Sequence, residues 1–517
     1  MSTAAMLDHD RLRTLWDLVA YHAETRPDAV ALEFEGRRTR YCDLLPSALG
    51  LAAWLAGQGV GKGTRIAYLG KNSDRYFVLL FAVARLGGVL VPLNWRLSPE
   101  EWRYIVEDSV AVLLFGDEEF LDRAQALATA TGLPAAKLIP DAPTGSFDRA
   151  PPPEDDEVIF QVYTSGTTGR PKGAMLTHRN MLALRAPGYR AGLEWFPGGG
   201  DTSLVVLPVA HIAGTAYGVF GLYPGGRLVI SRDFDPGETL RLIEEARATH
   251  LLLAPAAMRL VLEHPAAATT RLESLRFLTY GASPIPAALL ERAMACLGCG
   301  FVQMYGMSEA AGGVVALSPN DHASGDPERL RSAGRAMPGV EIAIFDDDDR
   351  PLAAGEVGEI AVRSNAVMPG YWRLPKATAE AIVAGGWLRT GDVGRQDADG
   401  YLYVLDRAKD MIISGGENVY PAEVENAIFG HPDVADVAVI GVPSAKWGED
   451  VMAIVVPREG CTPTLDSVAS WARSRIAGFK VPKHLSLVDE LPRNAGNKVL
   501  RRLLREPFWA GQERRVH

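Results

Sequence analysis

A loop rich in glycine and hydroxyl side chains, with a single lysine, follows an apolar segment near residue 160. The segment 158–162 runs into Tyr163-Thr-Ser-Gly-Thr-Thr-Gly-Arg-Pro-Lys-Gly173. Glycine permits tight turns with positive φ, so consecutive amide N–H groups can converge on an anion, and Lys172 adds positive charge. The combination predicts a polyphosphate-binding loop, and the alternative is a flexible polar surface loop. Four hydroxyl side chains supply further donors: Thr164, Ser165, Thr167 and Thr168.

The elements around this loop are predicted to alternate between strands and helices. Residues 65–69 have a strand pattern, 74–86 a helical pattern that begins after Asn72-Ser73, and 89–91 a second strand pattern. This order is typical of a βαβ unit. Comparable patterns recur at 204–207, 236–248, 251–254 and 277–280. The simplest interpretation is a large parallel or mixed sheet flanked by helices.

The pattern changes twice towards the C-terminus. From about residue 335 short strands dominate, and 340–345 and 358–363 form a predicted hairpin around four aspartates at 346–349. We interpret these aspartates as a solvated turn and not as a metal site. After Asp406 the pattern becomes α+β: helices at 421–430 and 466–477, and strands at 437–441, 451–456 and 485–488. We therefore predict an N-terminal domain, 1–405, and a C-terminal domain, 406–517.

Composition excludes several classes of protein. The 517 residues are 47% hydrophobic and 22% charged, with a net charge of −10, which is typical of a globular chain and not of a basic nucleic-acid binder. Four cysteines are too few for a disulfide scaffold, and Cys296-Leu-Gly-Cys299 lacks further metal ligands nearby. The acidic residues Asp8 and Asp10 argue against an N-terminal signal peptide. The longest apolar stretch, 76–93, contains Arg85 and two glycines, which argues against a membrane-spanning helix. The sequence predicts a cytoplasmic protein with no transmembrane segment.

The loop 163–173 closely resembles the phosphate loop of the adenylate-forming superfamily, which includes acyl-CoA synthetases, peptide-synthetase adenylation domains and luciferases. Further motifs of that superfamily follow in order and cover nearly the whole chain. They are Gln303-Met-Tyr-Gly-Met-Ser-Glu309, Trp387-Leu-Arg-Thr-Gly-Asp392, Asp406-Arg-Ala-Lys-Asp410 and Ser414-Gly-Gly-Glu-Asn-Val-Tyr-Pro421.

The resemblance implies a role for each matched residue. Thr164, Ser165, Gly166, Thr167, Thr168, Gly169 and Lys172 bind the phosphates of ATP. Glu309, with Thr164, holds Mg²⁺, for which oxygen ligands are suited. Tyr305 stacks on adenine, and Asp392, assisted by Arg407, accepts hydrogen bonds from the ribose. Gly281, Ala282, Gly306 and Ser308 belong to the segments around the nucleotide and the acyl group.

The resemblance also assigns a catalytic lysine, Lys498, which bridges the incoming carboxylate and the α-phosphate. The family has glycine directly before this lysine, whereas this chain has Asn497 there, with Gly496 one place earlier. Asparagine tolerates positive φ better than most residues, so the loop is expected to keep its turn. Ser308 replaces a threonine of the family and keeps the hydroxyl.

The implied fold class is α/β: a large multilayer N-terminal domain with mixed β-sheets and flanking helices, and a small mobile α+β C-terminal domain that rotates about Asp406. The implied second substrate is coenzyme A, because 414–421, with Gly415 and Gly416, and 446–449, with Trp447, resemble the pantetheine tunnel of acyl-CoA synthetases. We accordingly expect no carrier domain after residue 517 and no peroxisomal signal at the chain end. Within 471–505, nine basic residues against two acidic ones predict a basic lid that receives phosphates.

The acid substrate is less well defined. Pro208-Val-Ala-His-Ile-Ala-Gly214 resembles the segment whose histidine, here His211, lies near the carboxylate or gates the thiol tunnel. Ala210 and the small residues 310–313 predict a roomy pocket, with medium- or long-chain fatty acids slightly favoured over hydroxycinnamates. A stand-alone adenylating enzyme and a catalytically degenerate acyl-adenylate-binding protein are the alternatives. The expected partners are the acid, ATP and coenzyme A, without nucleic acid, and a homodimer is compatible with the sequence.

Overall fold

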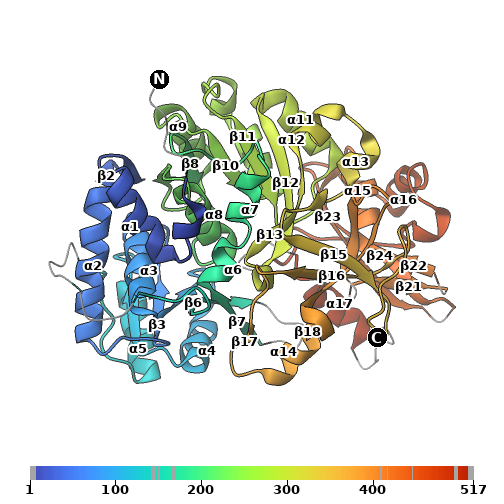
Figure 1. The fold of residues 1–517 in the computed structure, drawn as a ribbon. Coiled ribbons are helices and arrows are strands. Elements are labelled where there is room, and N and C mark those ends of the chain that lie inside the picture. The colour runs from blue at the N-terminus through green and yellow to red at the C-terminus, as the bar shows by residue number, and fades with distance from the viewer. Residues whose placement is uncertain are drawn as a thin grey trace.

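Four β-sheets organise the chain (Figure 1). The computed structural model describes residues 7–140, 147, 152–164, 170–407, 410–415, 417–444, 446–493 and 499–510. Seven of the predicted site residues therefore lie outside the described residues: Ser165, Gly166, Thr167, Thr168, Gly169, Gly416 and Lys498. The side chain of Arg407 is likewise not described.

The first sheet has nine strands, and six neighbouring strands at its centre are parallel. In spatial order they are β14 (Arg335–Ala336), β13 (Gly312–Leu317), β12 (Gly300–Met307), β11 (Phe277–Gly281), β10 (His250–Leu253), β8 (Thr202–Val205), β9 (Arg227–Ile230), β1 (Val30–Phe34) and β2 (Arg37–Arg40).

The second sheet has six strands and carries the predicted phosphate loop. Its order is β17 (Gly370–Tyr371), β7 (Lys172–Thr177), β6 (Val158–Thr164), β4 (Val89–Leu93), β3 (Arg65–Leu69) and β5 (Leu113–Gly116). The strands predicted at 65–91 and at 204–280 therefore lie in two sheets, and the interpretation of one large sheet was wrong. Strand partners are chosen by contacts between distant segments, which a local pattern does not encode.

Helices separate these sheets and cover their outer faces. The largest apolar core contains residues of α1, α2, α3 and α8 together with residues of both sheets. A second core joins the first sheet to α9, α10 and α11, and a third joins the second sheet to α4 and α5. The order is therefore helix, sheet, helix, sheet, helix, as Figure 1 shows. This agrees with the predicted multilayer α/β class.

The helices of the N-terminal part follow the chain between the strands. They are α1 (Leu15–Thr25), α2 (Tyr41–Gly57), α3 (Asp74–Leu86), α4 (Pro99–Ser109), α5 (Leu121–Thr131), α6 (His178–Leu182), α7 (Arg185–Arg190), α8 (Ile212–Leu222), α9 (Pro236–Glu245), α10 (Pro255–Glu263), α11 (Ala287–Leu297), α12 (Pro319–Ser324), α13 (Pro327–Arg331) and α14 (Pro375–Ala381). Helix α3 shows why the local prediction succeeded. The Ser73 hydroxyl accepts the Tyr76 N–H at 3.1 Å, and Gly87 ends the helix with a φ of 67°.

A third sheet contains the predicted hairpin, β15 (Val340–Phe345) and β16 (Gly358–Ser364), which pair antiparallel. Next to them lie β19 (Trp387–Gln396), β18 (Ile382–Val383) and β20 (Leu402–Arg407). At the acidic turn between β15 and β16, the carboxylate of Asp346 binds Arg350 at 3.0 Å.

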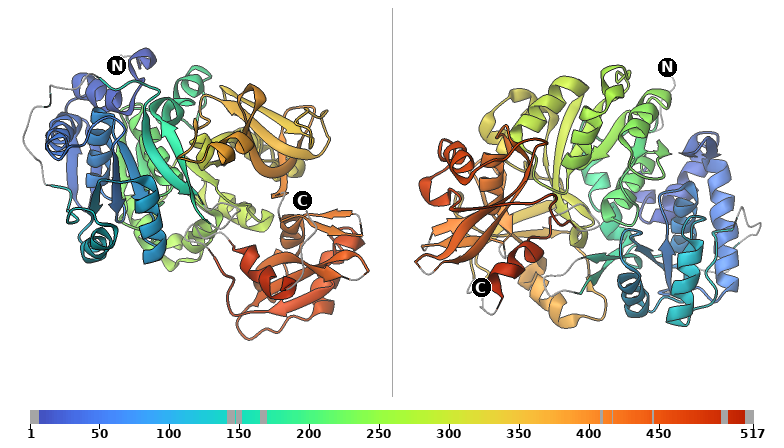
Figure 2. Two further views of the ribbon diagram at one scale, coloured as in Figure 1. Left: turned by 90° about the horizontal axis from the view of Figure 1, so that it is seen from below. Right: turned by 180° about the vertical axis from the view of Figure 1, so that it is seen from behind.

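The fourth sheet belongs to the C-terminal part, which forms a lobe of its own in Figure 2. Its strands are β22 (Glu417–Val419), β21 (Ile412–Ser414), β24 (Gly448–Pro457), β23 (Val434–Ser444) and β25 (His484–Leu487). Helices α15 (Pro421–Phe429) and α16 (Leu465–Arg473) pack on one face, and α17 (Arg501–Trp509) lies along β23. The predicted boundary at 405/406 falls inside β20 and stays a prediction. None of the helices in the described part of the chain is long and apolar enough to cross a membrane.

A buried histidine should make stability depend on pH. The Nδ1 atom of His178 accepts the Leu15 N–H at 3.2 Å, and burial lowers its pKa from 6.5 to about 3. The unfolded chain therefore binds a proton that the folded chain excludes, and stability falls as the pH drops from 6.5 towards 3. We expect His178→Asn, which keeps an acceptor, to flatten this dependence by about 1.4 kcal/mol per pH unit, measured by denaturant unfolding between pH 6.5 and 4.5.

The matched control is His484→Asn, because the side chain of His484 is 50% exposed. This variant should keep the wild-type slope. An unchanged slope in His178→Asn would contradict the assignment.

Candidate active site

A buried carboxylate lies where the two main sheets meet. Glu309 follows β12 in a short 3-10 helix, Ser308–Ala310, and is only 6% exposed. Its Oε1 atom accepts the Thr164 hydroxyl at 3.0 Å and the Tyr371 hydroxyl at 2.9 Å. Burying a carboxylate is costly unless donors replace the lost water, and these two hydroxyls do so. The structure thus brings together Glu309 and Thr164, which the sequence placed in one predicted metal site.

The predicted phosphate loop leaves the same junction. Strands β6 and β7 pair antiparallel, and Thr164 on β6 lies opposite Lys172 on β7. Of these two strand ends, Thr164 binds Glu309 directly, and Lys172 lies beside the ring of Tyr371, whose hydroxyl also binds Glu309. A loop with this placement can present its amide groups and Lys172 to a phosphate beside the carboxylate.

Tyr371 is a site residue that the sequence analysis missed. Its hydroxyl donates to Glu309, and Lys172 Nζ lies 5.1 Å from the centroid of its ring. Burial and the charge of Glu309 both raise the pKa of Tyr371, so the phenol stays protonated and remains a donor. Strand β17 pairs with β7, which puts Tyr371 opposite Ala174. No local pattern signals this contact, because Tyr371 lies 62 residues from Glu309.

A second polar pair lies between β12 and β19. The Tyr305 hydroxyl donates to Asp392 Oδ2 at 2.8 Å, and Asp392 is only 8% exposed. Asp392 also lies opposite Arg407 in the β19–β20 pairing, so the three predicted nucleotide residues are close together. A carboxylate in this position can accept hydrogen bonds from neighbouring hydroxyl groups of a sugar.

The predicted small residues lie in tightly packed backbone. A Cβ atom at Gly306 would lie 1.9 Å from the Gly312 carbonyl oxygen, and one at Gly281 would lie 2.3 Å from the Met304 carbonyl oxygen. Ala282, directly after β11, has a φ of 68°. Ser308 begins the 3-10 helix that carries Glu309. Any side chain at Gly306 or Gly281 would therefore push apart the strands that hold Tyr305 and Glu309.

His211 lies at the N-terminus of α8, next to a buried amide. Its Nε2 atom is 3.0 Å from Asn94 Nδ2. Because an amide nitrogen only donates, Nε2 is the acceptor, and the proton of the neutral ring lies on Nδ1. The Asn94 side-chain oxygen accepts the Arg96 N–H at 3.0 Å, and the Trp102 indole N–H donates to the backbone carbonyl of Asn94 at 2.8 Å; both contacts keep this residue in place. The imidazole is therefore oriented by α4 and the segment after β4.

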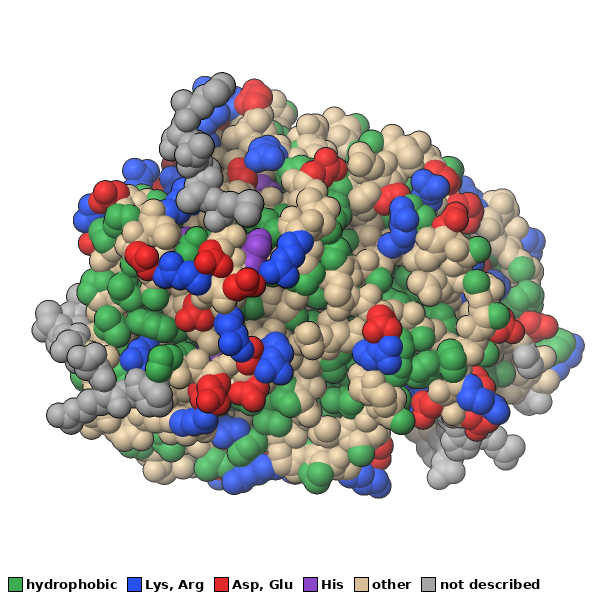
Figure 3. All heavy atoms as spheres, in the orientation of Figure 1, with side chains coloured by type: hydrophobic (Ala, Val, Ile, Leu, Met, Phe, Trp, Pro, Cys, Tyr) green, Lys and Arg blue, Asp and Glu red, His purple; other side chains and the backbone are tan. Residues whose placement is uncertain are grey.

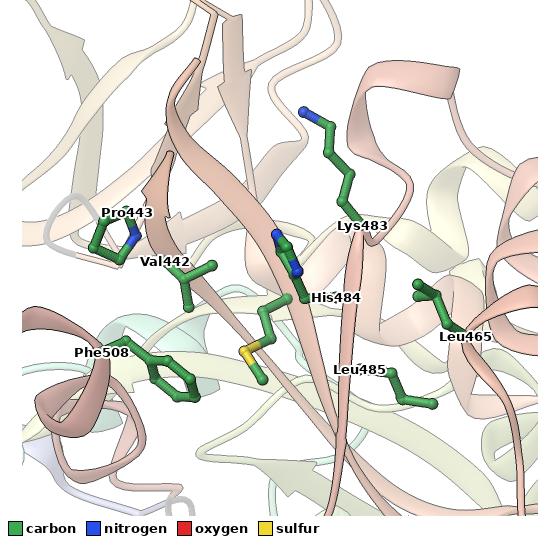
Figure 4. Close-up of a pocket in the computed structure, with 8 residues that line it drawn as sticks. Val442, Pro443, Leu465, Lys483, His484, Leu485 and Phe508 are labelled. Atoms are coloured by element: carbon green, nitrogen blue, oxygen red, sulfur yellow. The ribbon is translucent and has the colours of Figure 1, made fainter. Parts of the chain in front are cut away.

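In the C-terminal part, Gly415 and Trp447 are in direct contact. The Gly415 N–H donates to the Trp447 carbonyl at 2.8 Å, Gly415 has a φ of 64°, and a Cβ there would lie 2.7 Å from the indole. The Trp447 side chain is 42% exposed, with Lys446 Nζ 4.5 Å and Lys483 Nζ 5.1 Å from its ring centroid. Lys483 also borders a groove of about 700 Å³, which Val442, Met452 and Phe508 line from β23, β24 and α17 (Figure 4).

Much of the positive charge of the predicted basic lid is paired with acids, and its role towards phosphates stays a prediction. Five of the nine basic residues within 471–505 form ion pairs inside the C-terminal part, with acids that come earlier in the chain. The pairs are Arg501 with Glu425 and Asp410, Arg505 with Asp410, Arg493 with Asp436, Lys480 with Glu423 and Lys483 with Asp450. A local count of charges misses partners supplied by other elements. On the face shown in Figure 3, basic and acidic side chains are likewise intermixed.

Comparison with known proteins identifies the family. Residues 19–372 match the AMP-binding enzyme family, and residues 423–498 match the AMP-binding enzyme C-terminal domain. The chain belongs to the AMP-binding enzymes. The two matches together include Thr164, Glu309 and Lys498, whereas the motifs at 387–392, 406–410 and 414–421 lie between the matched ranges.

Three relatives show what this AMP-binding enzyme is similar to. It is 38% identical over 99% of both chains to a fatty acid–[acyl-carrier-protein] ligase, ScoC, of Streptomyces coeruleorubidus. It is 40% identical to a feruloyl-CoA synthase of Amycolatopsis sp, over 94% of this chain and 97% of that one. A solved structure of O-succinylbenzoate coenzyme A synthetase (MenE) from Bacillus subtilis, in complex with ATP and magnesium ion, is 31% identical. Its TM-score is 0.84, with 94% of this chain and 98% of that one covered.

The donor set at Glu309 fits a magnesium ion. Mg²⁺ binds through one or two carboxylates, waters and substrate phosphates, and Glu309 and Thr164 offer a carboxylate and a hydroxyl oxygen beside the phosphate loop. The described residues hold no cluster of three or more His, Cys, Asp and Glu side chains around a common point. Such an ion would therefore take its other ligands from ATP and water.

Tyr371→Phe tests the newly identified contact. Removing this donor leaves Glu309 less firmly positioned, so the concentration of Mg²⁺ needed for half-maximal activity should rise about three- to tenfold, with a smaller change at saturating Mg²⁺. The measurement is a Mg²⁺ titration of pyrophosphate release.

The matched control for this titration is Tyr403→Phe, whose hydroxyl donates to Asp397 at 3.2 Å, away from the site. The control should keep the wild-type Mg²⁺ requirement. Equal curves for the wild type and Tyr371→Phe would show that the contact is unimportant.

Proposed function

We propose that this chain is an ATP-dependent carboxylate–CoA ligase that acts in two steps. First, a carboxylate oxygen of the acid attacks the α-phosphate of ATP, which gives an acyl-adenylate and releases pyrophosphate. Second, the thiol of coenzyme A attacks the acyl carbon, and AMP leaves with its electron pair. The observation that carries the proposal is the junction at Glu309, where a buried carboxylate, the ends of the phosphate loop and the Tyr305–Asp392 pair meet.

In the first step, the chain mainly positions ATP and neutralises charge. The loop residues 165–169, with Thr164 and Lys172, bind the phosphates. Glu309 and Thr164 hold Mg²⁺, which offsets the charge that develops on the leaving pyrophosphate. Asp392 and Arg407 bind the ribose, and Tyr305 lies against the adenine. Gly281, Ala282, Gly306 and Ser308 keep the surrounding backbone close enough to form this site.

The C-terminal part completes the site. Lys498 contacts the incoming carboxylate and the α-phosphate, and the part rotates about Asp406 between the two steps. Supporting this hinge, the Ala422 N–H donates to Asp406 Oδ2 at 2.8 Å, which joins the start of α15 to β20. The division into domains 1–405 and 406–517 belongs to the same proposal.

In the second step, Gly415, Gly416 and Trp447 line the path of the pantetheine thiol, and His211 lies where the acid and the thiol meet. The exposed indole of Trp447, with Lys446 and Lys483 close to its ring, gives a surface that suits a phosphate-bearing thiol. The free cysteines Cys42, Cys296, Cys299 and Cys461 support a reducing, cytoplasmic location. A homodimer stays a prediction.

The acid is proposed at the level of its class. The relatives named for fatty acids and for ferulate mirror the two classes that the sequence favoured. A medium- or long-chain fatty acid and a hydroxycinnamate both place a carboxylate at His211 and an extended tail beyond it.

The reaction is tested by pyrophosphate release with a panel of acids, with and without coenzyme A. We expect pyrophosphate release in the presence of at least one acid, and equimolar consumption of coenzyme A when it is added. Pyrophosphate release without thiol consumption would replace the ligase by a stand-alone adenylating enzyme. Absence of release with every acid would support a degenerate, binding-only relative.

Lys498→Ala separates the two half-reactions. This variant should lower the rate of adenylate formation by about a hundredfold or more, while it still converts a supplied acyl-adenylate and coenzyme A to the thioester. Lys376→Ala is the control, because the Lys376 side chain is 92% exposed on α14, and it should retain both activities. If both half-reactions fell together in Lys498→Ala, the proposed role of Lys498 would be wrong.

A further inference from the structure

Three residues of the phosphate-loop motif take no part in binding ATP in the proposed reaction. Tyr163 and Gly173 are the two ends of the motif, and Pro171 directly precedes Lys172. Tyr163 lies opposite Gly173 in the β6–β7 pairing, one residue before Thr164. Each of the three residues makes a contact with a part of the chain outside the loop, and these contacts lead to α4.

The start of the loop is held by α4 through a tyrosine hydroxyl. The Tyr163 hydroxyl donates to Asp108 Oδ2 at 2.6 Å and accepts the Gln161 side-chain N–H at 3.0 Å. Burial and the Asp108 carboxylate both raise the pKa of Tyr163, so the phenol stays protonated and remains a donor. Gly173 leaves room for this contact, because a Cβ there would lie 2.7 Å from Gln161 Nε2 and 3.1 Å from Tyr163 Cζ. The position of Thr164, the next residue, is thereby linked to Asp108.

The end of the loop is held by the same helix, about one turn earlier in α4. The Tyr104 hydroxyl donates to the Pro171 carbonyl at 3.1 Å, and Arg170 Cζ lies 5.6 Å from the centroid of the Tyr104 ring. This carbonyl belongs to the planar peptide group that joins Pro171 to Lys172, so the hydrogen bond orients the backbone that leads into the lysine. The rings of Tyr104 and Tyr163 are in edge-to-face contact, with centroids 6.4 Å apart.

A third contact joins α4 to the residue after Tyr371. The Trp372 indole N–H donates to the Asp108 carbonyl at 2.9 Å, and the Trp372 backbone N–H donates to the Gly173 carbonyl at 2.8 Å. Since Tyr371 binds Glu309, the same helix is also connected to the buried carboxylate. Figure 1 shows α4 beside β7 and β17, the strands that carry these residues.

Fixing the ends of an anion-binding loop should raise its affinity for the anion. A glycine-rich segment loses much conformational freedom when its amide groups converge on a phosphate. Ends that are already fixed leave less freedom to lose, and this preorganisation favours binding. Because Thr164 and Lys172 are these ends, contacts with α4 should affect the β- and γ-phosphates of ATP more than its adenine or ribose.

We propose that α4 positions the phosphate-binding ends of the loop, with Tyr104 and Asp108 as positioning residues for Lys172 and Thr164. Neither side chain touches ATP, and each acts through the end of the loop that it holds. Both residues lie outside the sequence motifs of the active site. The inference rests on the proposed function, because it concerns the affinity of the same site for the pyrophosphate portion of ATP.

The experiment compares ATP with AMP, which lacks the β- and γ-phosphates. Binding of each nucleotide in the presence of Mg²⁺ is measured by titration calorimetry for the wild type, Tyr104→Phe and Asp108→Ala. Each variant removes one hydrogen bond to the loop, so the Kd of ATP should rise about three- to tenfold, while the Kd of AMP stays within about twofold. Asp108→Asn keeps an acceptor oxygen for the Tyr163 hydroxyl and should recover part of the ATP affinity.

Two control variants remove comparable groups that do not contact the loop. Tyr189→Phe removes a tyrosine hydroxyl of α7 that likewise donates to a proline carbonyl, that of Pro197, at 2.6 Å. Glu107→Ala removes a half-exposed carboxylate next to Asp108, which pairs with Arg103 on the same helix. Both variants should bind ATP with the wild-type Kd.

Kinetics give a second readout that a general loss of structure would not produce. In Tyr104→Phe, the KM of ATP for pyrophosphate release should rise about three- to tenfold, with the KM of the acid unchanged. Conversion of a supplied acyl-adenylate and coenzyme A to the thioester involves no pyrophosphate, so this half-reaction should keep its wild-type rate.

The two nucleotides separate this inference from the proposed function. A loss of ATP affinity in Tyr104→Phe with unchanged AMP affinity supports the inference, even if no acid is turned over. Equal ATP affinities of the wild type and Tyr104→Phe, or parallel losses for ATP and AMP, overturn it, even if the enzyme is an active ligase. A wild type that binds no ATP overturns the proposed function, and the inference with it.

Discussion

The buried carboxylate of Glu309 is the interaction on which the active-site architecture depends. Glu309 follows the first sheet, whereas both of its hydroxyl donors, Thr164 and Tyr371, come from the second sheet. A charge in this position would be costly without these donors, so the two sheets must meet at the correct distance for the carboxylate to be buried. The same contact brings the ends of the phosphate loop to the carboxylate. A magnesium ion bound at Oε1 of Glu309 would compete with the two hydroxyl groups that stabilise this buried oxygen.

In the C-terminal part, basic side chains form ion pairs with acidic side chains of the same part. Arg501 and Arg505 on α17 bind Asp410, and Arg501 also binds Glu425 on α15. These pairs hold the helix that follows Lys498 against the rest of the part. Because the ion pairs of these described residues lie within the C-terminal part, they are compatible with the proposed rotation about Asp406. The basic residues of 471–505 thus mainly stabilise the C-terminal part, through ion pairs with its own acids.

Helix α8 carries the histidine that the proposed function places at the acid. Its N-terminus presents His211, which Asn94 orients, and its body lies between the two main sheets.

Local patterns were sufficient for much of the chain. The helix 74–86 was predicted to the residue, because Ser73 and Gly87 are strong start and stop signals. The hairpin of β15 and β16 and the multilayer α/β class were also predicted correctly. The distribution of strands over two sheets was not, and neither was the pairing of the basic residues of α17. Tyr371 was missed, because its partner Glu309 lies 62 residues away.

The sequence by itself thus determined the family and the kind of reaction, and it predicted which residues face ATP. These depend on motifs of about ten residues, whose glycines, hydroxyls and charges have the same chemistry in any context. Only the tertiary structure decided which side chains stabilise Glu309 and which charges of the described residues form ion pairs. Those properties depend on desolvation and on distances between elements, and both arise when distant segments pack together.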